Sequence, residues 1–96
     1  MKKNLSLKNE DRLLATHVSN NSDFEAACLT GDGAKIMAIV ETEMEKHKLF
    51  TPGSKKLQED IRTMLQGKPK VSASVGANVM MFVWNSRMRG IGLGVN

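Results

Sequence analysis

Residues 71–90, with the sequence VSASVGANVMMFVWNSRMRG, decide the fold of this chain. The first five of these residues alternate with a period of two, as in a strand, whereas the apolar run that follows fits either a strand or a helix. A helix capped by Ser74 would have Arg87 and Arg89 in its last turn and Gly90 just beyond, which are common signals of a helix end. These end signals and the abundance of Met favour a helix.

The two interpretations lead to different fold classes. A helix gathers one set of side chains on one side at helical spacing: Ala77, Met80, Met81, Trp84 and Met88. A strand over residues 79–84 would instead be buried on both faces, within a small antiparallel sheet over residues 71–95. We predict an all-α domain of four or five helices around an aliphatic and Met-rich core, with the α+β fold as the alternative.

The upstream helices are predicted from capping residues and apolar periodicity. They are expected between Asn9 and Asn20, over residues 23–29, over residues 33–49 and over residues 54–66. Ser22 and Glu25 have the spacing of a capping box, Asp32 can cap the third of these helices, and Thr51 or Ser54 can cap the fourth. Inward-facing residues of the two shorter helices are expected to be Leu13, Leu14, Val18, Phe24, Ala27 and Cys28.

The predicted helix over residues 33–49 separates apolar from charged side chains. Its apolar stripe contains Ile36, Met37, Val40, Met44 and His47, with Ile39 beside it. Its other face is expected to expose Glu41, Glu43, Glu45, Lys46 and Lys48. A solvated charged face of this kind does not predict acid–base catalysis.

The length of the chain, 96 residues, is that of one domain with one small core, which makes a deep enzyme cleft unlikely to form. We assign residues 1–8 to a flexible basic arm, residues 9–89 to the helical domain and residues 90–96 to a Gly-rich tail. No segment has the apolar length of a membrane span or of a signal peptide. A single cysteine, Cys28, agrees with a reducing compartment, so we expect a cytoplasmic protein.

Charge is distributed unevenly along the chain. Residues 13–49 carry a net charge of −3, whereas residues 50–96 carry +5, from seven basic and two acidic side chains. Such asymmetry predicts one end of the molecule that attracts anions, and nucleic acid is the commonest anionic partner of a small basic protein.

Two glycine-containing motifs resemble cofactor sites only superficially. Gly31-Asp32-Gly33-Ala34-Lys35 lacks the spacing of a phosphate-binding loop and the Ser or Thr after the Lys, so we interpret it as a helix end followed by a helix start. Residues 90–94 lie too close to the end of the chain for a helix to follow them, as a dinucleotide site requires. We predict no cofactor.

A metal site and a catalytic nucleophile are also not predicted. Glu43 and His47 share one helical face, but a metal needs further ligands, and an isolated pair with this spacing is usually a surface ion pair. Cys28 lies on an apolar helix side, where a thiol is an inert small hydrophobe. We therefore expect no enzyme activity.

The predicted function is that of a small regulatory module that binds nucleic acid or a nucleoprotein complex through its basic C-terminal half. The residues expected to make these contacts are Lys55, Lys56, Arg62, Lys68, Lys70, Trp84, Arg87 and Arg89. One alternative is a protein-binding inhibitor or adaptor, of the type carried by phages and mobile elements, that uses the Met-rich surface around Trp84. A second alternative is a homo-oligomer assembled through that same surface.

Overall fold

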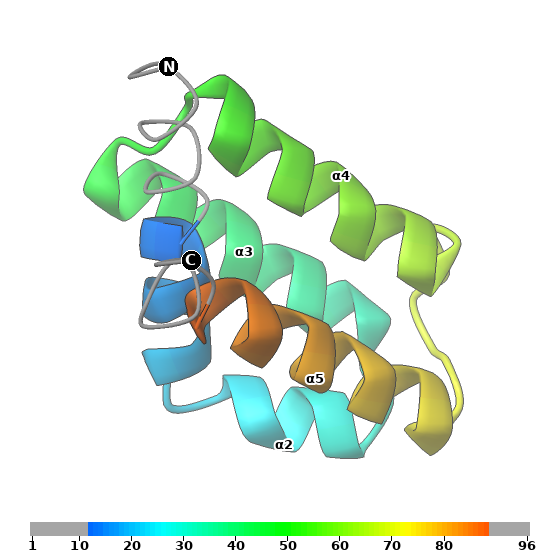
Figure 1. Cartoon of the computed structure of the whole chain (residues 1–96). Coiled ribbons are helices and arrows are strands. Elements are labelled where there is room, and N and C mark those ends of the chain that lie inside the picture. Colours follow the sequence, from blue (N-terminus) through cyan, green and yellow to red (C-terminus); the bar gives the residue numbers. More distant parts are fainter. Residues whose placement is uncertain (1–11, 89–96) are drawn as a thin grey trace.

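The computed structural model describes residues 12–88, and these residues form an all-α domain, as predicted (Figure 1). Residues 12–20 are helical, and four helices follow: α2 over Phe24–Leu29, α3 over Gly33–His47, α4 over Pro52–Leu65 and α5 over Ala73–Met88. The Asn9 cap, the basic arm, Arg89 and the Gly-rich tail lie outside the described residues.

The segment that decides the fold is helical from Ala73 to Met88, so the alternative sheet is not formed by residues 71–88. The predicted cap was wrong by two residues. Ser72, rather than Ser74, accepts the N–H of Val75 through its hydroxyl oxygen, at 3.2 Å, and its carbonyl oxygen accepts the N–H of Gly76. The earlier start places Gly76 in the first turns of α5, where a Cβ would lie 1.9 Å from the Cys28 carbonyl oxygen of α2.

The caps of α3 and α4 follow the prediction, but that of α2 does not. Asp32 accepts the N–H of Lys35 at the start of α3, and Thr51 accepts the N–H of Ser54 at the start of α4. The predicted capping box of α2 is wrong, because Asp23 occupies the cap position without a side-chain cap bond. Asn21 instead accepts the N–H of Asp23, which closes the turn before the helix.

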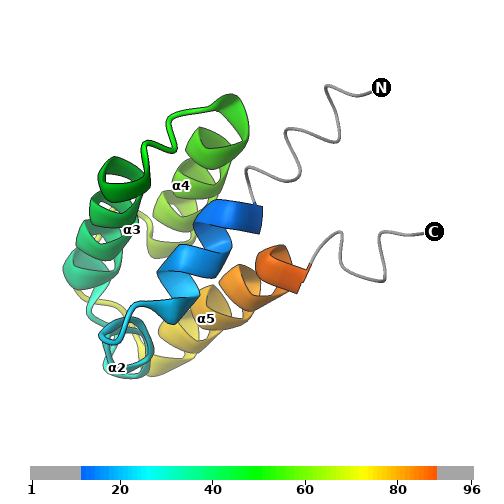
Figure 2. The same cartoon turned by 90° about the vertical axis from the view of Figure 1, so that its left-hand side faces the viewer.

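The helices are arranged around one core, with α3 and α4 antiparallel and α5 packed against both α2 and α4 (Figures 1 and 2). The helix over residues 12–20 lies beside α3 and α5. Buried apolar side chains of the described residues come from every helix: Leu14, Ala15, Val18, Phe24, Ala27, Cys28, Ile36, Ile39, Val40, Met44, Leu57, Ile61, Leu65, Val79 and Val83. The core is therefore aliphatic, as predicted, but it is not Met-rich: among the described residues Met44 is the one buried Met, and Met81 and Met88 are exposed. Leu13, which was predicted to face inward, is exposed as well.

Two glycines join the turn between α2 and α3 to the loop between α4 and α5. Gly31 has a φ of 69° and its carbonyl oxygen accepts the N–H of Val71, while Ala34 donates its N–H to the carbonyl of Pro69. A Cβ at Gly33 would lie 2.3 Å from the Lys68 carbonyl oxygen. The glycines of the motif over residues 31–35 thus serve helix capping and close backbone packing, in agreement with its interpretation as a helix end and start.

None of the helices formed by residues 12–88 combines the length and the apolar character that crossing a bilayer requires.

Candidate functional site

The predicted basic residues do not meet at one place. Lys55 and Lys56 lie in the first turns of α4, whereas Lys68 and Lys70 follow its C-terminal end, about 20 Å along the helix axis at 1.5 Å per residue. Figure 2 shows the helix over residues 12–20 passing between the N-terminal end of α4 and the C-terminal end of α5. Antiparallel packing of α4 and α5 alone would bring Arg87 toward Lys55 and Lys56, but this helix lies between the two ends.

Two of the basic side chains on α4 have acidic neighbours. The Lys56 ammonium lies 3.1 Å from Asp60, and the Arg62 guanidinium lies 3.8 Å from carboxylate oxygens of both Glu41 and Glu59. Exposed pairs of this kind stabilise a fold by about 1 kcal/mol or less. They nevertheless offset the positive charge that a phosphate backbone would meet on this helix.

Arg87 is held in place at the end of α5 rather than projecting freely. Its guanidinium donates hydrogen bonds to the Ser19 hydroxyl at 3.1 Å and to the Asn20 side-chain oxygen at 3.2 Å. The same group lies over the Trp84 ring, 4.7 Å from the ring centroid. It therefore links α5 to the end of the helix over residues 12–20 and packs against one face of the indole.

Three large apolar side chains lie on the exposed side of α5, beside the exposed Asn78 and Asn85. Met81, Trp84 and Met88 are exposed to 61%, 44% and 47%, and their spacing places them on one stripe of the helix. The buried stripe of α5 consists instead of Gly76, Val79, Val83 and Ser86. Trp84, whose exposure the sequence left open, thus lies at the centre of a solvent-facing set, which we call the α5 surface and define as Met81, Trp84, Arg87 and Met88.

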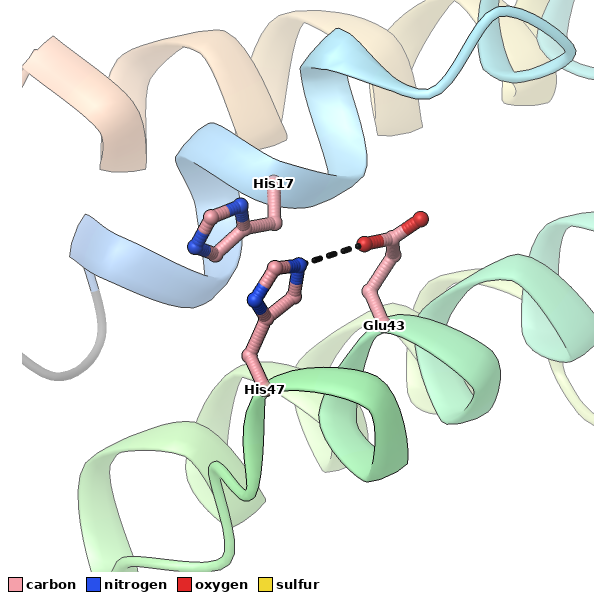
Figure 3. A group of neighbouring side chains, drawn as sticks. All are labelled: His17, Glu43 and His47. Atoms are coloured by element: carbon pink, nitrogen blue, oxygen red, sulfur yellow. Dashed lines mark ion pairs between the residues drawn. The ribbon is translucent and has the colours of Figure 1, made fainter.

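A second group of functional side chains, not predicted from the sequence, joins the helix over residues 12–20 to α3 (Figure 3). The imidazole rings of His17 and His47 are stacked, with centroids 3.5 Å apart and ring planes inclined by 8°. The Glu43 carboxylate lies 3.2 Å from Nε2 of His47. We call His17, Glu43 and His47 the histidine cluster.

Glu43 is buried, which corrects the prediction that it lies on the solvated face of the long helix. Its side chain is 6% exposed, and its second carboxylate oxygen accepts a hydrogen bond of 2.9 Å from the Asn21 amide. The signal was present in the sequence, since positions 36, 40, 43 and 47 follow one another at spacings of four, three and four. A charged side chain is usually exposed, which is why the prediction placed Glu43 on the solvated face.

The His17 imidazole has a pKa below its ordinary value of 6.5, first because burial disfavours the charged form and second because of the charge of His47. Lys46 lowers the pKa further, whereas Glu43 raises it. Folding therefore favours neutral His17.

We expect the protein to lose stability as the pH falls. At a pH well above 6.5, His17 is neutral in both the folded and the unfolded protein. Below pH 6.5 the unfolded chain binds a proton at His17, whereas the folded protein binds one only near its lower pKa, so protonation favours unfolding. The melting temperature, measured in EDTA between about pH 7.5 and about pH 5.5, should fall more for the wild type than for His17→Phe, which keeps a ring in the stack without titrating. Parallel curves for the two proteins would contradict this prediction.

Cys28 is buried, as predicted, and burial raises the pKa of its thiol to about 12, with a smaller effect of the Glu25 charge. Since the thiolate is the nucleophilic form, this residue has no means of acting as a nucleophile at neutral pH. The backbone carbonyl of Cys28 lies against Gly76 of α5, where α2 and α5 pack closely together.

A shallow groove of about 410 Å³ lies between the end of α4 and the start of α5. Lys68 and Lys70 line it together with Met64 and Val75. No salt bridge to either lysine is formed within residues 12–88, and both residues are exposed.

Comparison of the chain with models of protein families, with curated proteins and with solved structures finds no significant match.

Proposed function

We propose that this protein is a non-enzymatic binding module, an inhibitor or adaptor, that contacts another protein through the α5 surface. The observation that carries the proposal is the exposure of Met81, Trp84 and Met88 on one stripe of one helix. Exposed apolar side chains are common singly, but Trp and Met gathered in one place are typical of protein interfaces.

The geometry of Trp84 supports a role as the central contact. Trp and Arg are the residues that most often dominate binding energy, because they fill a pocket on the partner with a large, rigid group. Arg87 holds the indole through a cation–π contact and is itself fixed by Ser19 and Asn20. A side chain ordered before binding loses less entropy when the complex forms.

The partner best suited to this surface is a protein with an apolar groove wide enough for one helix face. Anchors at positions i, i+3 and i+7 match the helix-in-groove mode of recognition, with flexible Met side chains adapting to the groove on either side of Trp84. A buried single cysteine fits a cytoplasmic site of action, which forms part of this proposal.

The test is substitution of Trp84 by alanine in the complex with the partner identified by cross-linking. Trp84→Ala should weaken binding by roughly 30-fold or more, which corresponds to about 2 kcal/mol, while the melting temperature stays within a few degrees of that of the wild type. Phe50→Ala is the matched control, since Phe50 is an aromatic residue of similar exposure, 48%, outside α5. It should change the affinity less than threefold or so.

Two results would contradict the proposal. One is a partner that binds Trp84→Ala as tightly as the wild type but loses affinity for Phe50→Ala. The other is a homo-oligomer seen by light scattering that dissociates in Trp84→Ala, which would assign the α5 surface to a second copy of this chain.

Nucleic-acid binding is the second candidate function, and the exposed Lys68 and Lys70 beside the groove at the start of α5 favour it. Removing both ammonium groups should reduce the slope of log affinity against log salt concentration by about two. Binding of short DNA or RNA that survives in Trp84→Ala but weakens with salt and in Lys68→Ala/Lys70→Ala would establish this function in place of the first.

A further inference from the structure

The histidine cluster brings together three side chains whose donor atoms are of the kinds that bind divalent metal ions. His17 comes from the helix over residues 12–20, whereas Glu43 and His47 are one turn apart on α3 (Figure 3). One potential ligand atom of each residue lies within 4.8 Å of the other two. We infer that His17, Glu43 and His47 form a binding site for one divalent transition-metal ion of the Zn²⁺ type.

The identity of the ligands points to this class of metal. Two imidazoles and one carboxylate are a set that Zn²⁺ and its neighbours Co²⁺ and Ni²⁺ accept, whereas Mg²⁺ and Ca²⁺ prefer oxygen ligands alone. Three protein ligands leave a fourth position for water or for a ligand from outside. The partly exposed rings of His17 and His47 give that position access to solvent.

The separations are compatible with a shared ion. At Zn–N and Zn–O distances of roughly 2.1 Å, two ligand atoms of a tetrahedral site lie about 3.4 Å apart. Nε2 of His47 and the Glu43 carboxylate oxygen already have a separation of 3.2 Å. An ion between them would take the place of the proton that joins them in the ion pair.

One adjustment is needed, because the stacked rings point their nitrogen lone pairs side by side rather than toward one point. Turning an imidazole about its outer side-chain torsion corrects this, and that torsion is soft in histidine. Exposure of part of both rings leaves room for the turn.

Glu43 is prepared for the role of a ligand. Its side chain is 6% exposed, and the Asn21 amide holds one carboxylate oxygen at 2.9 Å, which leaves the other directed at His47. Metal ligands usually have such an outer hydrogen-bond partner, which fixes their orientation. Because the ligands come from two helices, the ion would tie the helix over residues 12–20 to α3.

The test uses the full chain without an affinity tag, stripped of metal with a chelator and titrated with Zn²⁺ by calorimetry. We expect one Zn²⁺ per chain, a rise of several degrees in the melting temperature, and binding at least about tenfold weaker in His17→Gln and in His47→Gln. Glu45→Gln, which removes an exposed carboxylate from the same helix, and Cys28→Ser, which removes the thiol, should both bind Zn²⁺ as the wild type does.

A measurement on the unsubstituted protein makes the test independent of how well the variants fold. The chain contains only two histidines, so their imidazole NMR signals are easily distinguished, and Zn²⁺ should shift both with the same saturation point. The inference is overturned if no stoichiometric binding occurs at about 100 μM Zn²⁺, if only one imidazole responds, or if folded His17→Gln binds as tightly as the wild type.

Discussion

Replacing Gly76 with alanine is expected to lower the free energy of unfolding by about 3 kcal/mol, a large part of what a domain of this size has. A Cβ at this position would lie 1.9 Å from the carbonyl oxygen of Cys28 and 2.9 Å from its carbonyl carbon. Both atoms belong to the backbone of α2, so no side chain can turn aside. The two helices would have to separate, which opens the core around Val79.

The expected loss exceeds the opposing effect of helix propensity. Alanine favours a helix over glycine by about 1 kcal/mol, and this gain is included in the net figure. Asn78→Ala is the control, since Asn78 is exposed on the same helix and its replacement should change the stability by about 0.5 kcal/mol or less. Urea unfolding followed by circular dichroism measures both, and equal midpoints would show that α2 and α5 do not meet at Gly76.

The sequence predicts a helix in this segment but does not predict which of its faces is buried. The contact at Gly76 explains which face that is. Apolar side chains occur on nearly every side of α5, so periodicity alone does not choose between them. The choice is made by close packing, which requires a glycine at position 76 and buries Val79, Val83 and Ser86 on the same stripe. Met81, Trp84 and Met88 then face solvent.

The histidine cluster was beyond prediction for a different reason. His17 and His47 are separated by thirty residues and two turns, and capping signals define where helices begin and end but not how they cross. The spacing of Glu43 and His47 places them on one helical face, but no signal in the sequence places His17 beside them. The spacing of Glu43 on the inner stripe of α3 indicates burial, whereas its charge favours an exposed position, so the two sequence signals conflict.

For the predicted basic residues, the sequence gives the charge but not the arrangement. Residues 50–96 carry a net charge of +5, but their basic side chains do not lie at one place. An antiparallel arrangement of α4 and α5 would bring Arg87 toward Lys55 if nothing lay between them. The helix over residues 12–20 occupies that space, and its Ser19 and Asn20 accept the hydrogen bonds of Arg87. A net charge predicts that anions are attracted, but the position of each cation depends on tertiary packing.

Three neighbouring substitutions on α3 should separate its buried face from its exposed face. Val40→Asp is expected to unfold the domain, since Val40 is fully buried and a carboxylate without a partner costs several kcal/mol, against a total stability of about 5–10. Glu43→Ala should cost about 1–3 kcal/mol, because the Asn21 amide and Nε2 of His47 lose their acceptor. Glu41→Ala should cost about 0.5 kcal/mol or less, since its contact with Arg62 is exposed and long.

The orientation of α3 determines the order of these three effects. Urea unfolding at neutral pH measures that order. A helix rotated so that Glu43 faces water would make Glu43→Ala as harmless as Glu41→Ala, and it would leave the histidine cluster without its buried ligand. Glu43→Gln distinguishes the contributions further, because its amide oxygen still accepts the hydrogen bond from Asn21 while the negative charge beside His47 is lost. If Glu43→Gln recovers most of the stability lost in Glu43→Ala, the Asn21 hydrogen bond and the packing of the side chain contribute more to folding than its charge does. The negative charge would then not be needed for folding, in agreement with a role in binding a metal ion.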